Sequence, residues 1–195
     1  MTIKAVIFDM DGTLTEPLLD FDVIRREIGF LPDGAGILES LHAMAPWQRV
    51  KAHAVLAAHE QAAAEQSTLN DGAAELLKTL HADGVSVGIL TRNTRQSAFY
   101  VTQKHNLHYD GLVCREDGPP KPDAYGVRWL CHRFGAAPAQ TLVVGDFKHD
   151  LEAARSAGAI SVLLKNHAKA DTFEHLADYV IIHLGEIHRL IKTFK

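Results

Sequence analysis

Two aspartates, Asp9 and Asp11, stand two positions apart directly after the apolar run Ala5–Phe8. An unbroken apolar run of this kind predicts a buried strand, so we expect both carboxylates at its carboxyl end. Two negative charges this close raise the free energy of ionising each other unless a cation lies between them. The sequence Asp-Met-Asp-Gly-Thr therefore indicates a divalent-metal and acid–base site; the alternative is a pair of turn acids after a strand.

Three further sets of polar residues follow apolar runs or lie in the loops after them. The sets are Thr91-Arg92-Asn93, Lys121 within Pro-Pro-Lys-Pro-Asp, and Asp146 with Asp150 four positions later. In open parallel sheets, ligands bind beyond the carboxyl ends of the strands. We therefore expect the carboxylates, the Thr91 hydroxyl and the Lys121 ammonium to converge at one edge of a sheet.

The elements that must position these residues are six short apolar runs separated by helical patterns. The runs are Ala5–Phe8, Val85–Leu90, Leu112–Cys114, Thr141–Val144, Ile160–Leu164 and Tyr179–Ile182. Runs that are apolar on both faces and alternate with helices are typical of a parallel sheet with helices on both sides. We therefore predict an α/β fold, a doubly wound, Rossmann-like parallel sheet core with a small inserted α-helical cap. One core helix is predicted to begin with Pro122 and to end before Gly135.

The segment 16–70 breaks this alternation because it contains helical patterns and no strand signal. The longest of these patterns is rich in alanine, and its predicted apolar face carries Trp47, Val50, Ala54 and Ala57. A helical insertion is the simplest interpretation. We predict a core domain of residues 1–15 and 71–195 and a helical cap of residues 16–70.

The composition argues against several classes of protein. The 195 residues carry a net charge of −4, with 20 basic and 24 acidic residues, which disfavours binding to nucleic acid. No apolar stretch approaches the ~20 residues of a membrane span, and Met1 leads into the first predicted strand without a signal-like segment. We therefore expect a cytoplasmic protein, a monomer, that acts on a small molecule and binds no membrane.

Two of the carboxylates suit phosphoryl transfer, in which catalysis depends on positioning and charge neutralisation. Asp9 is the candidate nucleophile, because a carboxylate can attack phosphorus and form an aspartyl-phosphate that water later hydrolyses. Asp11 is the candidate acid–base residue, which would protonate the leaving oxygen and then activate that water.

The acids also provide the oxygen ligands that Mg²⁺ prefers. Asp9, the backbone carbonyl of Asp11 and the Asp146 carboxylate are the predicted metal ligands. Asp150 is expected to orient these ligands rather than to bind the metal.

The remaining polar residues are candidates for holding the phosphate and the substrate. The Thr91 hydroxyl, the Lys121 ammonium and the amides at the helix start after Arg92 are expected to hold the transferring oxygens. Arg92 and Asn93 themselves are further candidate substrate-binding residues.

Four motifs in this order resemble the haloacid dehalogenase superfamily, specifically its phosphoglycolate-phosphatase-like branch. They are DMDGT after the first predicted strand, the Thr of ILTRN, the Lys of KPDAY and the acidic pair of GDFKHD. The resemblance extends over the whole chain, including a helical cap after the first motif. It implies that Asp9 is the nucleophile, Asp11 the acid–base residue, Thr91 and Lys121 phosphate ligands, and Asp9, Asp11 and Asp146 the Mg²⁺ site.

Departures from the branch concern the substrate. The first motif is followed by Leu-Thr-Glu-Pro instead of the acidic-Ser pair that is common there, and the cap looks shorter. The presence of Asp11 argues against the dehalogenase branch, which lacks an acid at that position. Phosphonate hydrolysis would need a cap lysine for a Schiff base, and Lys51, the only lysine of the predicted cap, is expected on a solvated face.

The predicted function is a Mg²⁺-dependent phosphomonoester hydrolase that acts on a small phosphorylated metabolite through an aspartyl-phosphate intermediate. A cap hinged at its two chain crossings would close over the site, present Arg25, Arg49 or Lys51 to the leaving group and leave little room for a macromolecule. Two alternatives remain open. A phosphosugar mutase would use the same two carboxylates, and a phospho-accepting receiver domain would represent a different class.

Overall fold

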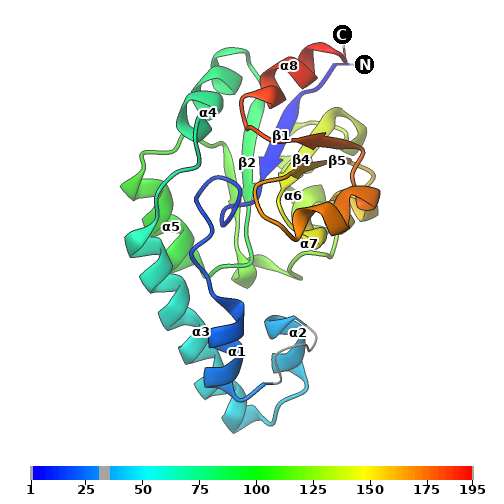
Figure 1. Cartoon of the computed structure of the whole chain (residues 1–195). Coiled ribbons are helices and arrows are strands. Elements are labelled where there is room, and N and C mark those ends of the chain that lie inside the picture. Colours follow the sequence, from blue (N-terminus) through cyan, green and yellow to red (C-terminus); the bar gives the residue numbers. More distant parts are fainter. Residues whose placement is uncertain (1, 31–35, 195) are drawn as a thin grey trace.

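The computed structural model describes residues 2–30 and 36–194 and has a six-stranded sheet at its centre. The strands are β1 (Ala5–Phe8), β2 (Ser86–Leu90), β3 (Gly111–Val113), β4 (Thr141–Gly145), β5 (Ile160–Leu164) and β6 (Tyr179–Ile181). They lie in the order β3-β2-β1-β4-β5-β6, and every neighbouring pair is parallel. The predicted doubly wound parallel sheet is confirmed, and β1 lies between β2 and β4 (Figure 1).

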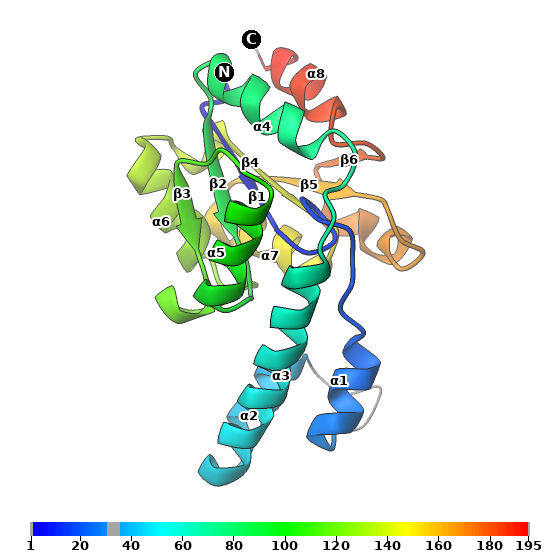
Figure 2. The same ribbon diagram turned by 90° about the vertical axis from the view of Figure 1, so that its left-hand side faces the viewer.

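Helices cover both faces of this sheet. They are α4 (Ala73–Ala82), α5 (Arg95–Lys104), α6 (Tyr125–Phe134), α7 (Lys148–Ala157) and α8 (Glu186–Lys192), with 3₁₀ segments at Arg115–Asp117, Pro138–Gln140 and Ala170–Leu176. One hydrophobic cluster takes residues from α4, α5 and α8, and a second takes residues from α6 and α7. The helices therefore form one layer on each side of the strands (Figure 2).

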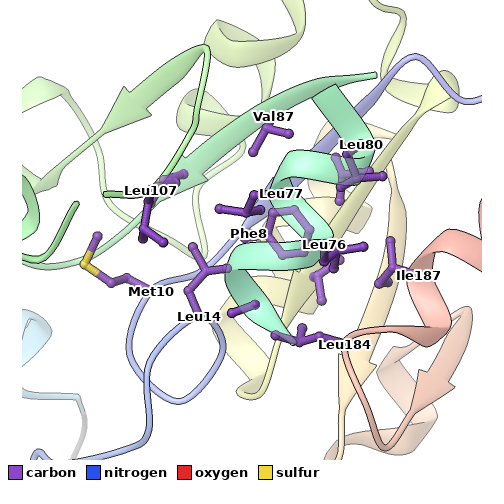
Figure 3. Packing of buried hydrophobic residues seen from close by; sticks show 14 of the residues in the cluster. Phe8, Met10, Leu14, Leu76, Leu77, Leu80, Val87, Leu107, Leu184 and Ile187 are labelled. Carbon is purple, nitrogen blue, oxygen red and sulfur yellow. The ribbon is translucent and has the colours of Figure 1, made fainter. Parts of the chain in front are cut away.

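All four residues of β1 are buried, which fixes this strand in the middle of the core. Val6 and Phe8 belong to the first cluster and Ile7 to the second, as the alternation of side chains along a strand requires. Phe8 lies against Leu76 and Leu77 of α4 in Figure 3. The residues that follow β1 are thus positioned by a fully buried strand.

The start of α6 differs from the prediction. The helix begins at Tyr125, and Pro122 belongs to a preceding turn in which the N–H of Asp123 donates to the carbonyl of Pro120 at 3.0 Å. The Asp123 carboxylate then accepts the N–H of Tyr125 at 2.7 Å. A side chain that bonds nearby backbone groups competes with the helix, which explains the later start. The predicted end before Gly135 is correct, since that residue has a φ of 60° at the helix end.

A helical insertion leaves the core after β1. It contains α1 (Phe21–Ile28), α2 (Ile37–His42) and α3 (Pro46–Gln66), which share a hydrophobic cluster that includes Ile24, Leu41 and Leu56. Asp20 caps α1, because its carboxylate accepts two backbone N–H groups at 3.0 Å. These helices lie at the end of the molecule opposite the two chain termini (Figure 1).

The face of α3 that packs inward is not the predicted one. Trp47 and Val50 are 75% and 73% exposed, whereas the buried residues are Ala52, Leu56, Glu60 and Ala64. These four residues recur every fourth position and so line one side of the helix. The apolar pattern failed here because alanine occurs all around α3 and because one buried position holds a charged residue.

The two segments that connect the core with the inserted helices, one before α1 and one after α3, run side by side. The N–H of Glu16 donates to the carbonyl of Thr68, and the N–H of Asn70 donates to the carbonyl of Leu14, each at 3.0 Å. These connecting segments lie close to residues 16 and 70, the predicted limits of the cap. The division into core and cap stays a prediction, and its residues 1, 31–35 and 195 lie outside the described part of the chain. Among the described residues, no helix has the length and apolarity needed to cross a membrane.

Candidate active site

The turn after β1 carries both predicted carboxylates. Three successive backbone N–H groups, those of residues 13–15, donate to the carbonyl of Met10 at 2.9 to 3.3 Å. Gly12 has a φ of 81°, and a Cβ at this position would lie 2.2 Å from Oδ2 of Asp146. Only glycine fits this turn, because it must take a left-handed conformation and let the Asp146 carboxylate approach closely.

Lys121 lies between two carboxylates. Its Nζ donates to Oδ1 of Asp9 and to Oδ1 of Asp150, both at 2.5 Å, and the residue is 3% exposed. Burial lowers the pKa of the Lys121 ammonium, but Asp150 and Asp9 raise it by more, so the net shift is upward. The structure therefore brings these predicted residues together around one fixed positive charge.

Asp9, Asp146 and Asp150 form the group that can hold a cation. One carboxylate oxygen from each lies within 4.8 Å of the other two. Burial, followed by the charges of Asp9 and Asp150, raises the pKa of Asp146 to about 8. Burial also raises the pKa of Asp150, against the lowering effect of Lys121. Three clustered carboxylates beside one ammonium leave negative charge that a hard, oxygen-binding cation such as Mg²⁺ would balance.

Asp11 has different surroundings. Its Oδ2 accepts a hydrogen bond from Nδ2 of Asn93 at 2.6 Å. Burial, followed by the charge of Asp9, raises the pKa of the Asp11 carboxyl to about 7, although the Asn93 bond acts to lower it. A carboxyl with a pKa close to neutrality can both donate and accept a proton.

Thr91 and Asn93 take up the positions that the sequence predicted at the end of β2. Thr91 is buried, and its Oγ1 accepts the backbone N–H of Asn93 at 3.1 Å. Asn93 in turn holds Asp11, so this residue orients the candidate acid–base group. That contact was not foreseen, since only a phosphate- or substrate-binding role was predicted for Asn93.

Arg92 points toward the inserted helices. Its Nη2 lies 2.7 Å from Oε1 of Glu39 on α2. The predicted role of Arg92 in binding the substrate stays a prediction, but its partner in the structure is an acid that the sequence analysis did not single out.

Two further site residues, Asn166 and His167, were missed. The Asn166 amide donates to the carbonyl of Gly12. The His167 Nε2 lies 3.0 Å from the carbonyl oxygen and 3.4 Å from Oδ2 of Asp146. Both residues follow β5, so the rule that polar residues after parallel strands approach the site would have identified them.

The inserted helices are attached to the core through α3. Glu60 is 3% exposed, and its carboxylate accepts two hydrogen bonds from the Arg115 guanidinium at 2.7 and 3.1 Å. The backbone N–H of Thr94 also donates to Glu60, at 3.3 Å. Lys104 of α5 donates to the carbonyl of Ser67 at 2.8 Å. The carboxyl-terminal half of α3 is therefore fixed on α5, against which it packs.

The basic residues proposed for the leaving group are arranged differently from one another. Arg25 is buried, with its guanidinium 5.6 Å from the ring centre of Phe30. Arg49 donates to the carbonyl of Met44 at 3.0 Å. Lys51 is exposed, as expected. Their contact with a substrate stays a prediction.

Comparison with known proteins agrees with this arrangement. Residues 22–158 match the haloacid dehalogenase-like hydrolase family. A haloacid dehalogenase-like hydrolase domain-containing protein of Arabidopsis thaliana is 28% identical over 98% of this chain and 84% of its own length. A hydrolase of Saccharomyces cerevisiae is 31% identical over 98% of this chain and 92% of its own length.

A phosphoglycolate phosphatase of Chromobacterium violaceum is 27% identical over 98% of this chain and 97% of its own length. Among solved structures, a hydrolase from Pseudomonas syringae superposes with a TM-score of 0.82 at 22% identity, covering 97% of this chain and 98% of the other. The structural likeness shows the fold, and the sequence matches confirm the resemblance inferred from the four motifs. The chain belongs to the haloacid dehalogenase-like hydrolase family.

Proposed function

We propose that the protein is a Mg²⁺-dependent phosphomonoester hydrolase that acts on a small phosphorylated metabolite through an aspartyl-phosphate at Asp9. The observation that carries this proposal is the arrangement after β1. Asp9 is held by Lys121, while Asp11, two residues later, has a pKa of about 7. A nucleophile and a proton-transfer group are thus presented from the same turn.

Asp9 and Lys121 suit the attack on phosphorus. The Lys121 ammonium is buried and charged, and it is bound to the carboxylate that would attack. When Asp9 carries the phosphoryl group, the same ammonium is within reach of the phosphoryl oxygens and can stabilise their charge.

Asp11 suits the two proton transfers. In its protonated form it can donate to the leaving oxygen, and as a carboxylate it can accept a proton from the attacking water. Its bond to Asn93 fixes the orientation of the carboxyl group, so that both steps can use the same position.

Asp9, Asp146 and the backbone carbonyl of Asp11 are the proposed Mg²⁺ ligands, and Asp150 holds Lys121 beside them. When bound, Mg²⁺ supplies positive charge that draws the carboxylates and a phosphoryl group together. His167 and Thr13 would keep Asp146 in place, since both contact this aspartate.

The relatives support phosphate-ester chemistry, because one of them is a phosphoglycolate phosphatase. The helical insertion after Asp11 and the hydrolase family match argue against the receiver-domain alternative. The mutase alternative differs only in the acceptor of the phosphoryl group, and no contact of the described residues favours it.

The test is phosphate release from a panel of small phosphomonoesters, including p-nitrophenyl phosphate, with Mg²⁺ and with EDTA. We expect turnover that requires Mg²⁺ and that is lost in Asp9→Asn, whose amide cannot attack phosphorus. Asp22→Asn, an exposed change on α1, serves as the control and should retain turnover. Undiminished activity in EDTA, or in Asp9→Asn, would refute the proposal.

A further inference from the structure

The ion pair between Glu39 and Arg92 joins the inserted helices to the catalytic edge of the sheet. The Glu39 side chain belongs to α2 and is 40% exposed, and the Arg92 side chain, from the loop after β2, is 20% exposed. Partial burial raises the pKa of Glu39, but its own backbone N–H and the Arg92 guanidinium lower it by more. Glu39 is therefore ionised, and its negative charge balances the positive charge of Arg92.

The chain places this pair beside the catalytic aspartates, because Arg92 follows Thr91 at the end of β2 and β2 pairs with β1. The Glu39 carboxylate lies 2.7 Å from the Arg92 guanidinium. Because neighbouring strands lie ~4.8 Å apart, a carboxylate bound to Arg92 lies near the end of β1.

The hydrogen bond of the residue that follows Arg92 supports this placement. Asn93, next to Arg92 in the chain, donates to Asp11. Asp11 in turn lies two residues after Asp9, which accepts a hydrogen bond from Lys121. The loop that contacts Glu39 therefore also holds Asp11, and we expect the leaving group of a phosphate ester bound to Asp9 to extend toward the inserted helices.

At both ion pairs that join described residues of the inserted helices to the core, the inserted helices contribute the negative charge. Glu39 neutralises Arg92, and the buried Glu60 neutralises Arg115. A second anionic group on the substrate would meet an arginine whose charge is already balanced and a carboxylate that repels it. A hydroxyl group can donate to the Glu39 carboxylate and accept from the Arg92 guanidinium at the same time.

We propose that Glu39 and Arg92 form the leaving-group subsite and select an uncharged, hydroxyl-bearing leaving group over one that carries a carboxylate or a second phosphate. This inference rests on the proposed hydrolase function and narrows its substrate class to polyol or sugar monophosphates. It sets this chain apart from a phosphatase of phosphoglycolate, whose leaving group carries a carboxylate.

The experiment compares two esters of nearly equal size, phosphoglycolate and 2-hydroxyethyl phosphate, which differ in a carboxylate against a hydroxymethyl group. For the wild-type protein with Mg²⁺, kcat/KM is expected to be at least about tenfold higher for 2-hydroxyethyl phosphate, the size of effect that one unfavourable charge contact gives. Each protein is characterised by the ratio of the two kcat/KM values, so that a general loss of activity cancels.

Two single variants test whether the Glu39–Arg92 pair selects the leaving group or only holds α2 on the core. Glu39→Gln removes the repelling charge and should shift the ratio toward phosphoglycolate by about tenfold, whereas Arg92→Gln leaves Glu39 unbalanced and should shift it the other way. A contact that only fastened α2 to the core would be broken equally by both variants and would move the ratio in one direction. Glu27→Gln, which alters an acid of α1 paired with His59, is the control and should not change the ratio.

The outcomes separate this inference from the proposed function. Absence of hydrolysis of both esters and of p-nitrophenyl phosphate would refute the hydrolase itself. Turnover of both esters with a wild-type preference for phosphoglycolate, or shifts of equal sign in the two variants, would overturn the subsite while leaving the hydrolase intact. Opposite shifts from a wild-type preference for 2-hydroxyethyl phosphate would establish it.

Discussion

At the scale of single residues, the charge balance of the site depends on Lys121. Its buried ammonium is shared by Asp9 and Asp150, and no other lysine among the described residues contacts either acid. The sequence predicted Lys121 as a phosphate ligand from its motif. Its second partner was not predictable, because the Asp150 contact depends on how the first turn of α7 packs against the loop after β3.

Replacing Lys121 should therefore affect stability and activity together. Lys121→Met leaves buried carboxylates without their counter-charge, and breaking such a pair typically lowers the free energy of unfolding by about 3–5 kcal/mol. Mg²⁺ should restore part of this stability, measured by chemical denaturation, but not the turnover. Lys148→Met, an exposed change three residues after Gly145, should stay within about 0.5 kcal/mol of the wild type. Equal stabilities of the two variants would contradict the charge-balance argument.

Asp11→Asn tests the proton-transfer role. The amide can keep the contact with Asn93 but cannot carry a proton between substrate and water, so turnover should fall by ~100- to 10,000-fold. The loss should be smaller for p-nitrophenyl phosphate, whose leaving oxygen needs little protonation, than for an alkyl phosphate, as long as attack on phosphorus limits the rate. Rates within a factor of two of the wild type would show that Asp11 is only a turn acid.

At the scale of elements, the sequence predicted the strands well and the inserted helices less well. Strands such as β1 and β4 are apolar on both faces, which gives an unambiguous signal. In α3, alanine occurs at exposed and buried positions alike. The apolar periodicity therefore predicted as buried the face that carries Trp47, which is exposed in the structure. Glu60 could not be recognised as buried, because its burial depends on Arg115, which lies 55 residues away in the chain.

The pair between Glu60 and Arg115 should be the main attachment of α3 to the core. Glu60→Gln removes the negative charge from a buried contact and leaves the Arg115 guanidinium without its partner, so we expect a loss of about 3–5 kcal/mol in the free energy of unfolding. The control is Arg95→Gln, whose pair with Asp117 is more exposed and should contribute less than ~1 kcal/mol. Similar losses in the two variants, measured by urea denaturation, would show that the Glu60 contact is unimportant.

At the scale of the whole molecule, acids that follow two strands, β1 and β4, gather at one edge of the sheet, and the metal-free protein must keep them there. Burial and mutual repulsion raise the pKa of Asp11 to about 7 and that of Asp146 to about 8. A carboxyl whose pKa is higher in the folded than in the unfolded chain binds its proton more tightly when folded. Its stabilising contribution is complete below the ordinary value of 3.8 and is lost as pH rises through 7 and 8.

The metal-free protein should therefore lose thermal stability between pH 5 and pH 8.5, and the increase in Tm on adding Mg²⁺ should be larger at pH 8.5. His149 acts in the opposite sense, because burial and Arg92 lower its pKa, but it is one group against several carboxyls. Asp146→Asn should reduce both the pH dependence and the Mg²⁺ effect. A Mg²⁺ effect on Tm that is equal at the two pH values, or larger at pH 5, would contradict the prediction.

The most direct test of the account is to find the residue that carries the phosphoryl group. The protein is mixed with p-nitrophenyl phosphate and Mg²⁺, quenched in acid during turnover and reduced with borohydride, which converts an aspartyl-phosphate to homoserine. Peptide mass mapping is predicted to find homoserine at position 9 in the wild-type protein and none in Asp9→Asn, which should not turn over. Modification at another acid, or turnover by Asp9→Asn, would contradict the central claim that Asp9 is the nucleophile.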